Sequence, residues 1–462
     1  MERMKFRENA TRESRLRAPH LPMSDVPAHR PAAWKWLVCG LLLLASMLLY
    51  MDRQTLPNVS VRITTEFKLS EAQYGTLEMC FGYAFAVGAV SFGVIADKWS
   101  VRWLYPCVVM LWSLMGFATG LVKSYEGLLV CRTLLGLFEA GHWPCALKTT
   151  QRLLSREQRT MGNSVLQSGA SIGAITTPLI MTWMLAGRTE EGAWRMPFLV
   201  IGSFGLVWMV AWFALLKPQD FDTPAVVETD KAGEPAANQP DRPFFEVILS
   251  RRFLALVVVV ACINTCWQII RAWLPKFLIQ GRGYAEPEAL YFNSLYYVAT
   301  DVGCLAAGAA SLWLVRRGQP VHRSRATVFG VCALLCALTG AISWLPRGWP
   351  LLGVLLVIAA GSLGLFPCYY SFSQELSTKH QGKVTGTLGF VAWVTSSPLQ
   401  WVFGRLYDTT KSFDLGIALA GLAPLIGFIA LTLLWGKDSD AAAQPSPPRA
   451  AQTPAAKPPN SR

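Results

Sequence analysis

The chain has 462 residues, of which 52% are hydrophobic and only 15% are charged. Soluble domains carry about 25% charged residues, so this chain has too few charges to cover a water-exposed surface. About twelve apolar runs of roughly 18 to 27 residues can be marked along it, and a bilayer-spanning helix needs roughly 20. These features exclude a soluble enzyme, a disordered chain, a disulfide-stapled secreted domain and an outer-membrane barrel. The sequence therefore predicts an all-α membrane protein.

The net charge of +13 arises from 42 Lys plus Arg against 29 Asp plus Glu. The basic residues gather in alternate loops, with about 28 expected at one membrane face and about nine at the other. Because cytoplasmic loops hold the excess of Lys and Arg, we expect both termini and the central loop in the cytoplasm. The basic charge thus reports topology in the cell inner (plasma) membrane. The expected partner is the lipid bilayer, and no nucleic acid is expected.

Twelve membrane spans are expected, in two sets of six. The predicted spans are 34–60, 73–96, 104–122, 128–150, 161–185 and 198–217, then 253–279, 289–315, 325–345, 350–376, 385–408 and 416–436. We interpret 1–33 as a cytoplasmic N-terminal segment without a cleavable signal, 218–252 as a cytoplasmic linker and 437–462 as a disordered cytoplasmic tail. The lobes 34–217 and 253–436 then show the hydropathy symmetry of a secondary transporter, with its site at the midplane between them.

Several residues are expected only to pack. All eleven cysteines lie inside predicted spans and none forms a CxxC pair, so neither a disulfide framework nor a zinc site is indicated. His142 is expected to be a packed or hydrogen-bonded side chain. Glycines recur at helix-packing spacing, either as static contacts or as surfaces that slide in a moving transporter. They are Gly82, Gly88, Gly93, Gly162, Gly169, Gly173, Gly382, Gly386 and Gly389.

Ionisable side chains inside the first lobe are the first functional candidates, because each costs about 2.5 to 3.5 kcal/mol at bilayer depth. Asp52 and Arg53 end the first apolar run, and Arg132 and Glu139 lie seven residues apart, hence on one helix face. That spacing suits a cavity with a cation for an anionic substrate and a carboxylate for a proton. We expect Arg53 to face this cavity and Asp52 to pair with the fourth span. A fixed buried salt-bridge network is the alternative.

The second lobe offers a polar stripe on its first span. Asn264, Gln268 and Arg271 share one face at spacings of four and seven, and Asp301 lies in the middle of the next span. An Arg271–Asp301 pair would neutralise both charges, either as part of the substrate site or as structural glue. Polar side chains that could line the same cavity, or anchor span ends at the interface, are Tyr296, Tyr297, Tyr369, Tyr370 and Gln374.

The segment 93–102, GVIADKWSVR, follows the second span at a cytoplasmic loop. It resembles the loop signature of the major facilitator superfamily, with Ser100 where glycine is usual. Together with the two sets of six spans, it implies the major facilitator fold of 12 transmembrane helices in two six-helix lobes. An aspartate at a helix end beside basic residues can form a charge relay, so Asp97, Lys98 and Arg102 are gating candidates.

A narrower resemblance is to the anion:cation symporter family, which includes hexuronate- and galactonate-type sugar-acid permeases. It rests on Asp52-Arg53, on Arg132 through Pro144 (R-x-x-x-G-x-x-E-A-G-x-W-P), on Gly162 through Pro178 and on Trp194-Arg195. It implies proton- or cation-driven uptake of small carboxylates. By matching positions it also implies proton carriage by Asp52 and Glu139, charge handling by Arg53 and Arg132, and contact between Gln167 and sugar hydroxyls.

The chain departs from that family at several positions. A tyrosine common in the second span aligns with Phe85, and Tyr83 lies two residues earlier. Tyr370 stands where tryptophan is frequent, and Val391 replaces a usual asparagine. The Gly-Pro pairing of drug antiporters is absent from the fifth span. The departures leave the expected proton machinery intact but leave the exact substrate open.

The sequence thus predicts a secondary active transporter, a monomer that performs proton-coupled symport of a small organic anion by alternating access. A sugar acid is expected, such as a hexuronate, aldonate or aldarate, with no cofactor or metal. The expected proton-coupling residues are Asp52 and Glu139. The expected substrate-binding residues are Arg53, Tyr83, Arg132, Gln167, Asn264, Arg271 and Tyr370. Rival readings are an uncoupled or exchange-type anion carrier, a drug/proton antiporter, a substrate sensor and a membrane enzyme using His142.

Overall fold

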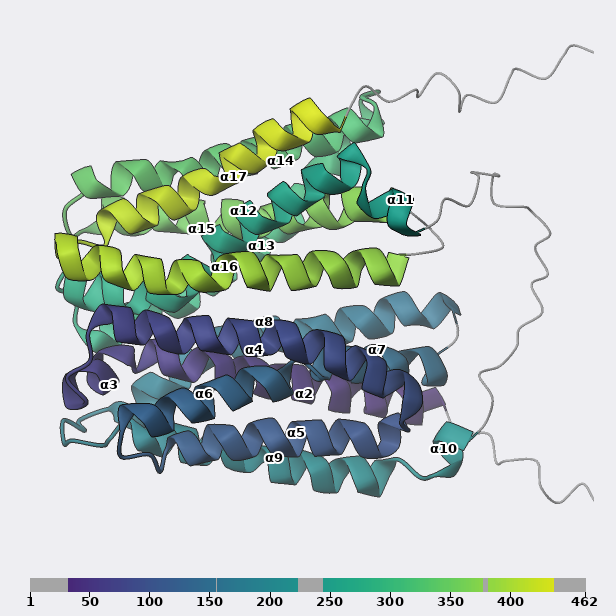
Figure 1. Ribbon diagram of the computed structural model, residues 1–462, viewed down its shortest axis with the longest axis horizontal. Helices are drawn as coiled ribbons and strands as arrows, with labels where there is room; N and C mark the ends of the chain where they lie inside the picture. Colours follow the sequence, from purple (N-terminus) through teal and green to yellow (C-terminus); the bar gives the residue numbers. More distant parts are fainter. Residues whose placement is uncertain (1–31, 155, 223–243, 377–380, 436–462) are drawn as a thin grey trace, which may run out of the picture.

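The structure is a computed structural model that describes residues 32–154, 156–222, 244–376 and 381–435. Within these ranges the regular elements are all helical. Figure 1 shows two helical bundles stacked on each other, one built from α2–α9 and the other from α12–α17. We call them the N-terminal and C-terminal bundles. The short helix α3 lies at one end of the stack, and the short helices α10 and α11 lie at the opposite end (Figure 1).

The N-terminal bundle follows the first predicted lobe closely. Its helices are α2 (Ala32–Asn58), α3 (Ser60–Glu66), α4 (Glu71–Lys98), α5 (Val101–Thr119), α6 (Tyr125–Glu139), α7 (His142–Leu153), α8 (Arg156–Leu185) and α9 (Arg195–Leu215). Ser70 and Gln73 form a capping box that starts α4, and Ser124 caps α6. The predicted span 128–150 is broken between α6 and α7, because Pro144 lacks the N–H that a continuous helix would need.

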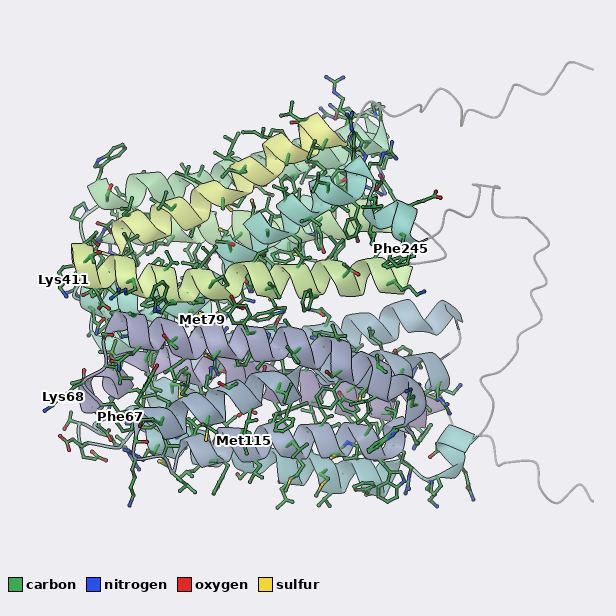
Figure 2. All side chains as sticks on the ribbon, viewed as in Figure 1. Phe67, Lys68, Met79, Met115, Phe245 and Lys411 are labelled. Atoms are coloured by element: carbon green, nitrogen blue, oxygen red, sulfur yellow. The ribbon has the colours of Figure 1, made fainter. Side chains whose placement is uncertain are left out.

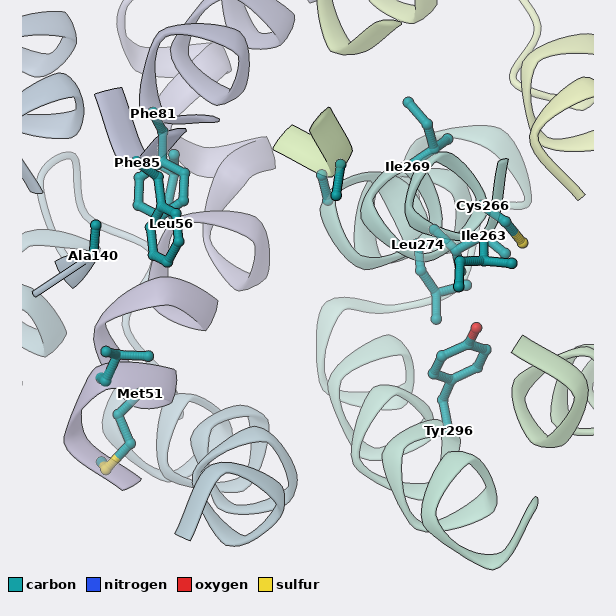
Figure 3. Packing of buried hydrophobic residues seen from close by; sticks show 14 of the residues in the cluster. Met51, Leu56, Phe81, Phe85, Ala140, Ile263, Cys266, Ile269, Leu274 and Tyr296 are labelled. Atoms are coloured by element: carbon teal, nitrogen blue, oxygen red, sulfur yellow. The ribbon is translucent and has the colours of Figure 1, made fainter. Parts of the chain in front are cut away.

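The C-terminal bundle begins after two short helices, α10 (Gln219–Asp222) and α11 (Phe244–Ile248). It consists of α12 (Arg251–Lys276) with the π-turn η1 (Phe277–Gly281), α13 (Glu286–Arg316), α14 (Val321–Ala337) with the 3₁₀ segment η2 (Leu338–Trp344), α15 (Trp349–Gln374), α16 (Gln381–Thr410) and α17 (Asp414–Leu434). Figure 3 shows a buried apolar set in each bundle, with Phe81 and Phe85 near Leu56 in one and Ile263 and Leu274 beside Tyr296 in the other.

Nine helical segments of the described residues are long and apolar enough to cross a membrane. They are α2, α4, α5, α9, α12 with η1, α13, α14 with η2, α15 and α17. The other three predicted spans correspond to α6–α7, α8 and α16. These segments hold buried charges or many Ser, Thr and Gln residues, which lowers their hydropathy. The all-helical prediction is confirmed, whereas the count of twelve spans and the cytoplasmic termini stay predictions.

The two bundles are tied together at the α3 end. Lys276 of α12 forms an ion pair with Glu71 of α4 at 2.7 Å, and Asp408 of α16 accepts hydrogen bonds from the first backbone N–H groups of α4. Helices α4 and α16 touch backbone to backbone, since a Cβ on Gly75 would lie 2.3 Å from the Gln400 carbonyl oxygen. Figure 2 shows Lys68 and Lys411, one from each bundle, at this end.

The glycines singled out by spacing fall into two groups. A Cβ on Gly169 would lie 2.1 Å from the Leu43 carbonyl oxygen of α2, and one on Gly88 would lie 2.4 Å from that of Leu137. In contrast, a Cβ on Gly93 or Gly386 would meet no atom within 4 Å. Only the first group is required for close helix packing.

We therefore expect Gly169→Ala to lower the free energy of unfolding by about 1 to 3 kcal/mol, because the methyl group must push α8 away from α2. The matched Gly93→Ala change adds the same methyl group in open space and should stabilise by up to about 1 kcal/mol through helix propensity. Thermal unfolding in detergent measures both. Equal melting temperatures for the two variants would contradict the packing assignment.

Glu66 ends α3 and holds the loop before α9. Its carboxylate accepts hydrogen bonds from the Gly192 N–H, the Trp194 indole at 2.6 Å and the Arg195 guanidinium at 2.6 Å. Burial raises the pKa of Glu66, but hydrogen bonds from Arg195 and Trp194 and the Arg195 charge outweigh it and hold the pKa below its usual value. This carboxylate therefore stabilises the fold only while it is ionised.

Replacing Glu66→Gln should lower stability at neutral pH by about 1 kcal/mol, a modest value because the pair is partly screened by solvent. A depressed folded pKa contributes stability that is lost as pH falls through it. The melting temperatures of wild type and Glu66→Gln should hence converge on acidification below about pH 4.5, the usual glutamate value. Glu191→Gln, on an exposed residue of the same loop, is the control. A gap that persists in acid would refute this account.

Candidate functional site

Arg53 and Glu139 form a buried ion pair inside the N-terminal bundle. The Nε and Nη2 atoms of Arg53 donate to Glu139 Oε2 at 3.0 and 2.7 Å, and the Glu139 side chain is fully buried. The Arg53 guanidinium also lies 5.1 Å from the ring centre of Phe85 and 5.7 Å from that of Trp393 on α16. Arg53 therefore faces the other bundle through an aromatic cage. Its predicted orientation toward the space between the lobes agrees with these contacts.

Glu78 of α4 forms the second buried cluster, and it joins the two bundles. Its Oε1 accepts from Arg132 Nη2 of α6 at 2.8 Å, and its Oε2 accepts from Arg271 Nη2 of α12 at 2.5 Å. Gln268 accepts from Arg271 Nε at 2.7 Å. The ionised groups are at most 3% exposed. Arg132 and Glu139 both point into the bundle, as their spacing predicted, but they bind different partners.

Asp52 lies apart from these ion pairs, packed toward α5. Its carboxyl is 2% exposed, and a Cβ on Gly116 would lie 2.7 Å from its Oδ1. Neither oxygen meets the geometry of a hydrogen bond within the described residues, although the Trp112 indole lies beside it. The expected pair with the fourth span is thus not formed. His142 is buried and hydrogen-bonded to Ser46 and Tyr105, each at 3.0 Å, as expected of a packed histidine.

A polar group on α8 faces α13 across the bundles. Ser171 donates to Asp301 Oδ1 at 3.1 Å, and Ser294 donates to the Ile175 carbonyl oxygen at 2.9 Å. Gln167 lies one turn before Ser171 on the same face, and it is exposed. The predicted Arg271–Asp301 pair is wrong, because Arg271 reaches Glu78 and Asp301 meets a hydroxyl group.

Two other predicted residues of the C-terminal bundle are placed differently from each other. The Asn264 amide donates to the Ala392 carbonyl oxygen and to Ser396 Oγ, both at 2.9 Å, so its donors hold α12 to α16. Tyr370 is 51% exposed and lies within electrostatic range of Tyr50 in the other bundle. Tyr370 therefore borders the space between the bundles, whereas the Asn264 amide contacts α16, and substrate binding by either residue stays a prediction.

Tyr83 does not join the cluster. It is 39% exposed and continues an exposed stripe of Val87, Val90 and Val94 on α4. Two residues along a helix turn the side chain by about 200°, so Phe85, and not Tyr83, meets Arg53. Tyr83 thus lies outside the buried charge cluster, and substrate binding by this residue stays a prediction.

The gating segment is only partly described. The side chain of Asp97 lies outside the described residues, as does that of Gln374, one of the residues predicted to line the cavity. Lys98 is exposed, and Arg102 stacks on Trp103 at 4.9 Å and reaches the Leu216 carbonyl oxygen at 3.4 Å. The charge relay of this loop thus stays a prediction.

Sequence reasoning missed Glu78, the residue that binds two arginines. The sequence does contain an indication of Glu78, because this residue is a lone carboxylate inside the apolar run 73–96. Its burial in the membrane costs as much free energy as that of the other intramembrane charges. The Glu71–Lys276 pair was also missed, since both residues lie near predicted span ends. Among the described residues, no three His, Cys, Asp or Glu side chains are grouped as a metal site would require.

The sequence matches the Major Facilitator Superfamily over residues 42–399. The chain belongs to this family. It is therefore a multi-pass membrane transporter and not an enzyme. The resemblance read from the loop segment 93–102 and from the buried charges is confirmed.

Relatives with assigned names are similar over most of their length. The hexuronate transporter of Escherichia coli (strain K12) is 23% identical over 419 residues, which span 89% of this chain and 96% of that one. The D-galactonate transporter of Escherichia coli O6:H1 is 26% identical over 333 residues, 67% of this chain and 75% of that one. A crystal structure of a bacterial homologue of the human lysosomal transporter Spinster, inward-facing and unoccupied, superposes with a TM-score of 0.72 at 16% identity, covering 88% of this chain and 98% of that one. This last likeness concerns the fold alone.

The different surroundings of the two acids predict opposite stability effects. Glu139→Gln removes the counter-ion of Arg53, and breaking a buried pair costs about 3 kcal/mol or more. Asp52→Asn replaces a carboxyl that has no hydrogen-bonded cation with a neutral group of the same shape, so stability should stay unchanged or rise. Thermal unfolding of both variants in one detergent is the measurement. A larger loss for Asp52→Asn than for Glu139→Gln would contradict this assignment.

Proposed function

We propose that the protein is a proton-coupled symporter that takes up a sugar acid by alternating access. The observation that carries this proposal is the set of buried charges at the junction of the bundles. Three arginines are held there by two glutamates, in the pairs Arg53–Glu139, Glu78–Arg132 and Glu78–Arg271. Buried guanidinium groups are suited to bind a carboxylate. The names of the relatives, which refer to hexuronate and D-galactonate, support a sugar acid.

Proton coupling follows from competition for Arg53. While Glu139 is ionised it occupies the guanidinium, and an incoming carboxylate is repelled. A proton on Glu139 removes that anion and leaves Arg53 free for the substrate. Asp52, buried in the same bundle, is the second proton carrier that we propose. Two protons carried with one monoanion would move net positive charge inward, which gains about 2.3 kcal/mol per 100 mV.

The sugar hydroxyls need polar groups that border the space between the bundles. Gln167 and Tyr370 are both exposed there and belong to opposite bundles, so each can donate to or accept from a hydroxyl group. We propose that Arg53, Arg132 and Arg271 bind the acid group and that Gln167 and Tyr370 read the hydroxyl groups.

The conformation is assigned from the location of the inter-bundle contacts. Ion pairs and helix caps join the bundles at the α3 end, including Arg62–Glu286 at 2.5 Å and Lys276–Glu71 at 2.7 Å. The excess of basic residues in the loops of the α10 and α11 end supports a cytoplasmic location for that end. We infer an inward-facing carrier whose periplasmic side is closed, with both termini cytoplasmic, in the inner membrane and functional as a monomer.

The test is uptake into proteoliposomes of labelled hexuronates, aldonates, aldarates and aromatic acids, with and without an imposed pH gradient. Wild type should accumulate a sugar acid only with the inside-alkaline gradient. Glu139→Gln should lose accumulation but retain exchange of internal for external substrate, because Arg53 is then permanently free. Glu126→Gln, an exposed acid of the same helix, is the matched control.

Three outcomes would contradict the proposal. Gradient-independent uptake would indicate an uncoupled or exchange-type carrier. Efflux of apolar cations driven by protons would indicate a drug antiporter. Gradient-driven accumulation by Glu139→Gln would remove Glu139 as a proton carrier.

A further inference from the structure

Glu78 holds two arginines with one carboxylate, one oxygen for each. The Oε1–Nη2 distance to Arg132 is 2.8 Å and the Oε2–Nη2 distance to Arg271 is 2.5 Å. The glutamate side chain is 1% exposed. A carboxylate shared between two guanidinium groups is the arrangement expected for a bound organic acid. Here the protein's own side chain supplies that carboxylate.

Arg132 and Arg271 have N–H donors that Glu78 does not bind. Nε and Nη1 of Arg132 and Nη1 of Arg271 are buried without a hydrogen-bond partner in the described part of the chain. Unpaired buried donors are costly, and those of a charged group more so. Two guanidinium charges against one carboxylate also leave this cluster one positive charge in excess. The cluster therefore favours the arrival of a second anion.

The two arginines differ in how they relate to Glu78. Arg132 belongs to the same bundle, because α4 and α6 pack together, whereas Arg271 belongs to the other bundle. When the bundles separate at the α3 end, Glu78 keeps Arg132 and must give up Arg271. A buried arginine without a counter-ion is strongly unfavourable. If Glu78 leaves Arg271 while the site is closed, another anion must therefore take its place.

We propose that Glu78 is the resident counter-anion of Arg271 in the empty carrier and that the carboxylate of the substrate displaces it. This inference rests on the proposed function. Substrate binding then transfers Arg271 from Glu78 to the substrate. After release of the substrate, Glu78 returns to Arg271 and allows the empty carrier to change conformation with its charges paired. Glu78 is thereby a positioning residue for both the loaded and the empty step.

A purely structural role for Glu78 makes a different prediction, and the chain contains a matched comparison. Glu71 lies two helical turns earlier on α4 and pairs with Lys276 of α12, so it joins the same two helices through a buried ion pair. If Glu78 were only an inter-bundle tie, replacing either glutamate would have the same consequences.

The experiment compares Glu78→Gln, Glu71→Gln and Arg271→Gln with wild type, using D-galactonate and D-glucuronate as probes. Glu78→Gln should bind the transported acid about tenfold more tightly, equivalent to about 1.4 kcal/mol, because the competitor of the substrate is gone. Arg271→Gln should weaken binding by a similar factor. Glu71→Gln should leave the affinity unchanged. Thermal-shift titration of the purified protein in detergent gives all of these affinities.

Transport provides a second signature. Glu78→Gln should retain exchange of internal for external acid but lose net uptake about 100-fold. The reason is that the empty variant must pass through a closed state in which Arg271 is buried without a counter-ion. The double variant Glu78→Gln with Arg271→Gln should regain part of the net uptake. Hydrogen exchange of residues 60–75 should increase in Glu78→Gln and Glu71→Gln alike, but not in Glu139→Gln, whose ion pair lies within one bundle.

The outcomes separate this proposal from the proposed function. If wild type transports neither probe nor any other acid of the panel, both are overturned. If wild type transports an acid and Glu78→Gln binds it no more tightly, only the displacement by substrate is overturned. Equal affinity changes in Glu78→Gln and Glu71→Gln would likewise overturn it. Should Glu78→Gln prove too unstable to purify, an unchanged affinity in Arg271→Gln would have the same effect.

Discussion

The cost of a charge inside the bilayer governs this structure. An arginine or a glutamate at that depth is tolerated only when it is paired, so each buried guanidinium at the bundle junction meets a carboxylate. These pairs set the rotation of four helices, because α2, α4, α6 and α12 must each direct a charged side chain inward. A carboxylate that pairs with an arginine also occupies it, and this occupation is the basis of the competition with an anionic substrate that we propose.

Polar groups also contribute to the contacts between the two bundles at the α3 end. The described contacts between the bundles at the α3 end combine hydrogen bonds and ion pairs with an aromatic contact, in which the ring centres of Tyr74 and Trp273 lie 4.9 Å apart. Asp408 binds the N-terminus of α4, and Asn293 donates to Asn58 at 2.8 Å. Each such group can exchange its partner for water when the bundles part, so the gain from closing is small. Close backbone contacts at Gly75 and Gly404 set the distance between α4 and α16.

The sequence was sufficient to predict the all-helical fold class, the approximate positions of the helices and several of the buried charged residues. Length and hydropathy determine where helices run, and the seven-residue spacing correctly placed Arg132 and Glu139 on one face. The partner of each buried charge could not be predicted from hydropathy or residue spacing. Arg271 pairs with Glu78 and not with Asp301 because α12 lies beside α4. That arrangement is part of the tertiary structure and cannot be read from residue spacing. Tyr83 and Phe85 differ by about 200° on α4, and only the structure tells which of them meets Arg53.

Three of the buried acids among the described residues differ in the number of cations that they bind. Asp52 has no cation within hydrogen-bonding geometry, Glu139 has one and Glu78 has two. Asp52, which has no hydrogen-bonded cation, is the acid that we propose as the second proton carrier. Glu139 has one cation, and the proposed coupling of a proton to an anion rests on the release of that cation when Glu139 is protonated. Glu78 has two cations in different bundles and can bind both only while the bundles are in contact. The number of cations bound to each carboxyl group, none, one or two, is thus the physical basis of the three different roles that we propose for them.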